Sequence, residues 1–143
     1  SNRDFPGHIL RHAAVYLVRE NQLDVDVIGR GYKPFDNKSN GLLPFRYSVV
    51  IENVQEPGYF TEKLSDAALC RTVPIYWGAP DVTEHFEADG MIICDSKADI
   101  ERALAQMSAE DYASRNKSVE ANFKTAEALA NMHKRASSLI LES

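Results

Sequence analysis

Several features that mark other protein classes are scarce in this sequence of 143 residues, which carries only two cysteines, Cys70 and Cys94. Both lie in apolar surroundings, and their spacing fits neither a metal site nor a disulfide framework, so we expect buried free thiols in a reducing compartment. No run reaches the roughly 20 uncharged apolar residues of a membrane span, and the start lacks the apolar core of a signal peptide. We therefore expect a soluble, cytoplasmic protein without a membrane span.

A basic excess is also missing, because the formal net charge is −5. Proteins that bind nucleic acid usually carry a positive excess, so we expect no nucleic-acid partner, and an anionic small ligand would need a local positive patch. The histidines show no metal-ligand spacing, and no nucleophile motif occurs. His8 and His12 share one helical face, which favours a solvated or phosphate-side pair over a metal site.

What is present is an alternation of strand and helix patterns, with no repeat and no long linker. Apolar runs predict strands over residues 25–29, 47–51, 73–77 and 91–94, and the last of these is expected to be buried. The continuous apolar run Tyr47–Ile51 is typical of a central strand covered on both faces. Helical spacing predicts helices over residues 9–18, 61–69 and 96–107, with a short turn over 82–86 and a long helical tail after Ser108. Thr61, Ser96 and Ser108 are the expected helix N-caps.

This alternation predicts an α/β fold, a Rossmann-like parallel sheet with helices on both faces. We expect residues 1–107 to form this domain and residues 108–143 to form a helical extension that packs on it. In such sheets, ligands bind beyond the carboxyl ends of the strands. The site is therefore expected in the loops that follow residues 29, 51–53, 77–78 and 94–95.

The loop and helix start at residues 52–63 carry the most informative polar residues. A helix N-terminus offers unpaired N–H groups and a partial positive charge, which suits a phosphate. Lys63 in the first turn opposes the helix dipole, unless an anionic ligand binds between them. The alternative is a surface ion pair of Lys63 with Glu62 or Glu56, which would carry no function.

The neighbouring residues leave similar alternatives open. Asn53 can cap the loop or donate its amide to a phosphate or sugar oxygen. Glu62 can be a first-turn acid that suits the dipole, or an acceptor for ribose hydroxyls. Tyr59 and Phe60 can anchor the loop in the core or form a platform beside a base or sugar.

Three ordered blocks of this sequence resemble the signature of glycosyltransferase family 10, the α-1,3/4-fucosyltransferases. They are Phe45-Arg46-Tyr47-Ser48-Val49-Val50-Ile51-Glu52-Asn53, then Gly58-Tyr59-Phe60-Thr61-Glu62-Lys63, and then Thr72-Val73-Pro74-Ile75-Tyr76-Trp77-Gly78-Ala79-Pro80. Upstream, Arg11 is similar to the arginine on the family's arginine-bearing helix, and Val25-Asp26 with Gly29 is similar to its Val-Asp...Gly strand. Ile51 stands where the family usually has Phe.

The resemblance implies the C-terminal, nucleotide-binding half of a two-domain GT-B enzyme, with GDP-fucose as donor substrate and no required cofactor or metal. It implies catalytic roles for Arg11 and Lys63, which would stabilise the departing diphosphate, and substrate-binding roles for Asn53, Tyr59, Thr61 and Glu62. It also implies that the glycan acceptor and the general base come through an N-terminal domain that this chain lacks. We therefore expect a fragment that does not catalyse transfer alone and that lacks its first strand.

Two further hypotheses remain open at the level of sequence. One is a GT-B glycosyltransferase domain that uses another nucleotide sugar, since Thr61-Glu62-Lys63 beside a strand end suits any diphosphate. The other is a non-catalytic module that binds a nucleotide sugar. Base specificity separates the first from a fucosyltransferase, and a complete N-terminal domain in the parent gene would exclude the second.

Overall fold

The structure is a computed structural model that describes residues 6–23, 25–28 and 46–142. The described helices are α1 (Pro6–Glu20), α2 (Glu62–Leu69), α3 (Lys97–Ala105), α4 (Ala109–Ser114) and α5 (Asn116–Glu142), with short 3-10 turns η3 (Val82–Glu84) and η4 (Ala88–Gly90). The strands are β1 (Asp26–Ile28), β2 (Tyr47–Ile51), β3 (Val73–Trp77) and β4 (Ile92–Ile93). Within these ranges, no helix is long and apolar enough to cross a lipid bilayer.

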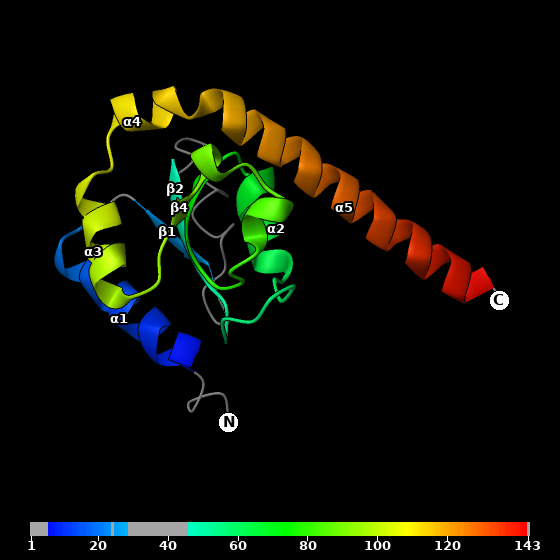
Figure 1. The fold of residues 1–143 in the computed structure, drawn as a ribbon, viewed down its shortest axis with the longest axis horizontal. Helices are drawn as coiled ribbons and strands as arrows, with labels where there is room; N and C mark the ends of the chain where they lie inside the picture. The colour runs from blue at the N-terminus through cyan, green and yellow to red at the C-terminus, as the bar shows by residue number, and fades with distance from the viewer. Residues whose placement is uncertain (1–5, 24, 29–45, 143) are drawn as a thin grey trace.

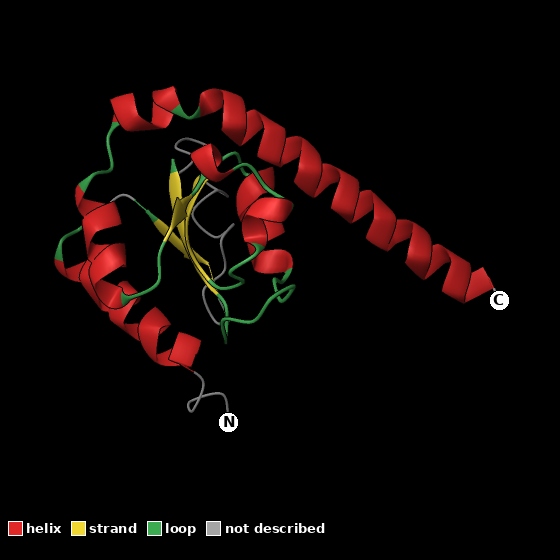
Figure 2. Cartoon of the chain, in the orientation of Figure 1, coloured by secondary structure: helices red, strands yellow, loops and turns green. Residues whose placement is uncertain are grey.

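The four strands form one parallel sheet in the order β1-β2-β3-β4. Helices α1 and α3 cover one face, and α2 with the first part of α5 covers the other (Figures 1 and 2). Because side chains alternate along a strand, Val49 and Ile51 pack toward α1 and α3, whereas Val50 packs toward α2. The predicted fold class and the central position of Tyr47–Ile51 are confirmed.

The local signals at helix starts are also confirmed. The Thr61 hydroxyl accepts a hydrogen bond from the Lys63 amide, and the Ser96 and Ser108 hydroxyls accept from amides three residues further on. Pro6 is the first residue of α1, where its missing N–H costs no hydrogen bond. These contacts are short-range in sequence, which is why the sequence alone identifies them.

Two expectations about burial hold only in part. In the run at residues 91–94, Met91 and Cys94 are buried as expected, but β4 comprises only Ile92 and Ile93, and Ile93 is 45% exposed because β4 lies at the sheet edge. Cys70 is half-buried rather than buried, since it ends α2 near the surface. Cys94 is buried and free as expected, and burial raises the pKa of its thiol to about 12.

The first half of α5 is fixed to the domain by a buried amide. Asn122 is 3% exposed, donates to the Glu87 carbonyl at 3.1 Å and accepts from the Glu87 amide at 2.7 Å. Nearby, Arg71 pairs with Glu120 at 3.0 Å and lies 3.8 Å from the centre of the Phe123 ring. The second half of α5 extends away from the sheet (Figure 1). The helical tail is therefore docked on the domain through its first half.

A second contact ties α4 to the start of β2. The Tyr47 hydroxyl donates to an Asp111 carboxylate oxygen at 2.6 Å, and Asp111 also pairs with Arg115 at 3.1 Å. Burial and then this hydrogen bond raise the pKa of Tyr47 from 10.0 to about 12.

Replacing Asn122 with Ala is expected to destabilise the fold by about 1–3 kcal/mol, because two part-buried hydrogen bonds to the Glu87 backbone are lost. The measurement is the free energy of unfolding in urea. Asn131→Ala on the exposed part of the same helix is the matched control, with an expected change within about 0.5 kcal/mol. Equal losses in the two variants would contradict the docking role of Asn122.

The raised pKa of Tyr47 makes stability depend on pH in the alkaline range. Its neutral form is favoured in the folded state, so its contribution is complete below the unfolded pKa of about 10 and is lost as pH rises to about 12. The free energy of unfolding should therefore fall more steeply between about pH 10 and 12 in the unmodified protein than in Tyr47→Phe. Denaturant titrations at several pH values test this, and parallel curves would contradict it.

Candidate functional site

The carboxyl end of β2 meets the first turns of two helices. The Gly7 amide in α1 donates to the Asn53 carbonyl at 3.0 Å, and α2 begins at Glu62 after the loop that follows β2. A Cβ atom at position 7 would lie 1.7 Å from the Glu52 carbonyl oxygen. Only glycine therefore allows α1 to approach the strand end this closely.

Arg11 and Asn53 are brought together at this strand end. Arg11 is 4% exposed, and its Nη2 donates to the Ile51 carbonyl at 2.7 Å and to Asn53 Oδ1 at 3.3 Å. The guanidinium group is thus held by the backbone at the end of β2. Two of the residues predicted to contact the donor are therefore neighbours, although 42 positions separate them in sequence.

The Glu52 carboxylate is fully buried between β2, β3 and the start of α2. Its Oε2 accepts from the Thr61 amide at 3.0 Å and from the Tyr76 hydroxyl at 3.2 Å, and its Oε1 accepts from the Thr61 hydroxyl at 2.8 Å. Burial, followed by the charge of Glu52, raises the pKa of Tyr76, so this phenol stays protonated and remains a donor. One carboxylate therefore joins two strands to a helix cap.

Lys63 points back toward this carboxylate. Its Nζ lies 3.8 Å from Glu52 Oε1, and its side chain is only 18% exposed. The ion pair joins Lys63 to a buried acid, rather than to Glu56 or Glu62 at the surface as the alternative interpretation supposed. The ammonium group is therefore held near the strand end that carries Arg11 and Asn53.

Tyr59 and Glu62 flank this centre. The Tyr59 amide donates to the Glu56 carbonyl at 3.1 Å, and the preceding Gly58 adopts φ +75 and donates its amide to Asp81 at 2.8 Å. Tyr59 is half-buried in this turn, and Glu62 is exposed at the start of α2. Thr61 uses its hydroxyl inside the protein, as an acceptor for the Lys63 amide and a donor to Glu52.

Comparison with known proteins points to one class of enzyme. No protein-family model matches the chain. Over 56 residues it is 39% identical to an α-(1,3)-fucosyltransferase of Helicobacter pylori, a match that covers 39% of this chain and 12% of that protein. Over 41 residues it is 37% identical to a putative fucosyltransferase of Acanthamoeba polyphaga mimivirus, covering 29% of this chain and 7% of that protein.

Solved structures agree in fold. An α1,3-fucosyltransferase matches with a TM-score of 0.55 at 24% identity, over 85% of this chain and 42% of that one. A structure of α1,3-fucosyltransferase with GDP-fucose matches with a TM-score of 0.57 at 23% identity, over 85% of this chain and 44% of that one. The chain is thus similar to fucosyltransferases in sequence over part of its length, and similar to α1,3-fucosyltransferase structures in fold. It spans less than half the length of the proteins it matches.

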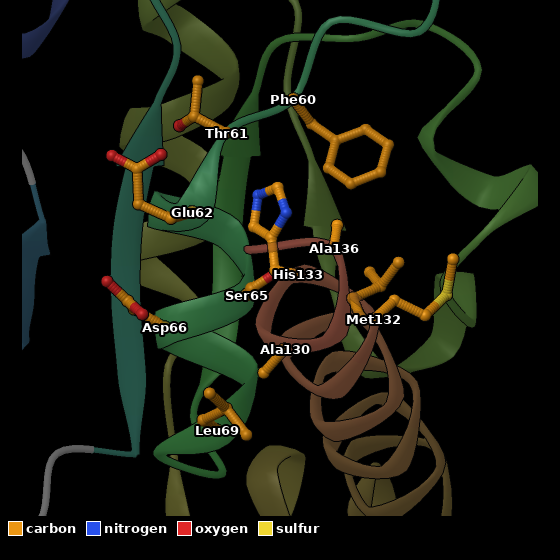
Figure 3. A pocket seen from close by; sticks show the side chains of 11 residues that line it. Phe60, Thr61, Glu62, Ser65, Asp66, Leu69, Ala130, Met132, His133 and Ala136 are labelled. Atoms are coloured by element: carbon orange, nitrogen blue, oxygen red, sulfur yellow. The ribbon is translucent and has the colours of Figure 1, made fainter. Parts of the chain in front are cut away.

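A hollow of about 500 Å³ opens beside this site, between α2 and α5 (Figure 3). Phe60, Ser65 and Leu69 line it from the loop and α2, and Met132 and His133 line it from α5. Thr61, Glu62 and Asp66 form its polar border, where burial and then the charge of Glu62 raise the pKa of Asp66. The hollow includes Thr61 and Glu62 but lies on the flank of α2 rather than at the strand ends.

Glu52 lies in the first of the three motif blocks, but no role for it follows from the sequence. Its signal is an acid placed directly after five buried strand residues, a position where a charge is costly unless it has partners. Its partner Tyr76 lies on β3, and Gly78, which makes space for the carboxylate side chain, directly follows that strand, a relation that no local pattern reveals.

The expectation that no metal or cofactor is required stays a prediction. In the described part of the chain, no group of three or more His, Cys, Asp or Glu side chains could hold a metal ion. Asp24, two residues before Asp26, lies outside the described residues, as does the expected strand end at Gly29.

Gly7→Ala is expected to lower the free energy of unfolding by about 1–3 kcal/mol, since the new methyl group would displace α1 from the end of β2. Urea denaturation measures the loss. Gly58→Ala serves as the comparison, because a Cβ there meets open space and reports only the cost of positive φ, about 1 kcal/mol. Unchanged stability in Gly7→Ala would contradict the close approach.

Proposed function

We propose that this chain forms the donor-binding part of a fucosyltransferase that uses GDP-fucose. The observation that carries the proposal is that two cations are held at the carboxyl end of β2: Arg11 contacts Ile51 and Asn53, and Lys63 at the N-terminus of α2 pairs with Glu52. The names of the sequence relatives and the matched structure with GDP-fucose support this donor. Strand ends of parallel sheets are the general location of such sites.

The charges of the site suit a diphosphate. Arg11 and Lys63 together exceed the single buried carboxylate of Glu52 by one positive charge, and the start of α2 adds a partial positive charge. Departure of GDP during an inverting transfer develops negative charge on the β-phosphate. Cations and N–H groups already in place stabilise that charge, and losing one such donor typically lowers the rate about 100- to 1000-fold.

The other proposed contacts to the donor are assigned from where each side chain lies relative to Arg11 and Lys63. Asn53 lies beside Arg11 and offers an amide to a phosphate or fucose oxygen. Glu62 is exposed one residue before Lys63 and offers a carboxylate to the ribose hydroxyls, with Tyr59 in the adjoining turn. Thr61 contributes through the cap that orients the Lys63 amide, because its hydroxyl is already bonded to Glu52.

Transfer also needs an acceptor hydroxyl and a base that removes its proton. We propose that both reach the donor through a second domain that faces this one, so that the fucosyl group passes to a glycan across the cleft. The fact that the chain spans less than half of its matched structures supports this arrangement.

Titration calorimetry of the chain with GDP, GDP-fucose and UDP-glucose tests the proposal. GDP and GDP-fucose are expected to bind and UDP-glucose is not. Lys63→Met should lower the affinity for GDP by about 10- to 100-fold, which is the effect of losing a hydrogen bond to a charged group.

The matched control is Lys97→Met on α3, whose side chain is 58% exposed and pairs with Glu101, and GDP affinity should stay within about twofold. Preference for UDP-glucose would favour another glycosyltransferase. Equal losses in both lysine variants would remove the site assignment.

A further inference from the structure

We infer that Glu52 is a positioning residue, which holds the Lys63 ammonium group at the strand end before the donor arrives. This inference rests on the proposed function, because it assigns Lys63 to a diphosphate. Glu52 itself is 0% exposed and therefore does not meet the donor. Its effect on the donor is exerted through Lys63 and Thr61.

The first step of the argument is the cost of a buried charge. An ionised carboxylate out of contact with water is stable only when its oxygens are hydrogen-bonded and its charge is opposed. Thr61 and Tyr76 supply the three hydrogen bonds, and Lys63 supplies the opposing charge. A cation at one defined position therefore stabilises the buried carboxylate.

The second step concerns Lys63, whose place is otherwise unfavourable. A cation in the first turn of α2 opposes the helix dipole, and a free lysine side chain adopts many rotamers. The Glu52 carboxylate offsets the unfavourable interaction with the dipole and restricts the lysine to fewer rotamers. The low exposure of the lysine side chain agrees with this restriction. A donor that binds therefore meets a cation that is already ordered, and less rotamer entropy is lost on binding.

The third step is the length of the ion pair. Charge-assisted hydrogen bonds between an ammonium and a carboxylate are usually about 2.7–2.9 Å long, whereas Lys63 Nζ lies 3.8 Å from Glu52 Oε1. The ammonium has three N–H donors. It can stay beside the carboxylate and still donate to a phosphate oxygen.

A double-mutant cycle tests this coupling. Glu52→Gln keeps the size of the side chain and removes its charge, and GDP affinity is measured by calorimetry in Glu52→Gln, Lys63→Met and the double variant. Glu52→Gln is expected to lower GDP affinity about tenfold when Lys63 is present, and less than about twofold in the Lys63→Met background. The same loss in both backgrounds, or tighter binding in Glu52→Gln, would overturn the inference.

Tyr47→Phe is the control for stability, since it removes a part-buried hydrogen bond at the opposite end of β2. Its GDP affinity should stay within about twofold even though its stability falls. A loss of GDP affinity in Tyr47→Phe as large as that in Glu52→Gln would show a general effect of destabilisation and overturn the positioning role.

A measurement without ligand covers the case in which Glu52→Gln does not fold. NMR relaxation of the lysine Cε groups in the unmodified chain should show Lys63 clearly more ordered than the exposed Lys97. Equal mobility would overturn the inference whether or not GDP binds. An ordered Lys63 in a chain that binds no GDP would instead contradict the proposed function and leave the Glu52–Lys63 contact in place.

Discussion

Burial of the Glu52 carboxylate is costly unless hydrogen bonds and an opposite charge compensate it, and the surrounding residues provide both. Thr61 donates from the cap of α2, Tyr76 donates from β3, and Lys63 brings its charge from the first turn of α2. These contacts fix the end of the central strand, the start of the helix and the cation relative to one another. The candidate site depends on this arrangement.

A second constraint acts on the other side of the same strand end. Gly7 lets α1 contact the backbone of Glu52 and Asn53, which places Arg11 against the Ile51 carbonyl. The two cations therefore reach the site from helices on opposite faces of the sheet. A ligand bound between them would contact both faces through a single strand end.

The sequence alone predicts the features that depend on interactions between residues close together in the chain. Strands β2 and β3 have the predicted bounds because their apolar runs are continuous, and the Thr61 and Ser96 caps bond within three residues. It was insufficient where distant segments meet. Nothing local distinguishes the edge residue Ile93 from a central one, or joins Asn122 to Glu87. Arg11, Asn53 and Lys63 were chosen by resemblance, and their contact with a donor stays a prediction.

Gly78 limits which side chains can stand at positions 52 and 76 as the site evolves. A Cβ at this position would lie 2.4 Å from the Tyr76 hydroxyl and 2.5 Å from Glu52 Cγ, so the three residues share one small volume. A larger residue at 78 requires a shorter side chain at 52 or the loss of the hydroxyl at 76. Positions 52, 76 and 78 should therefore co-vary among descendants of this sequence, with the acid retained only where the glycine is.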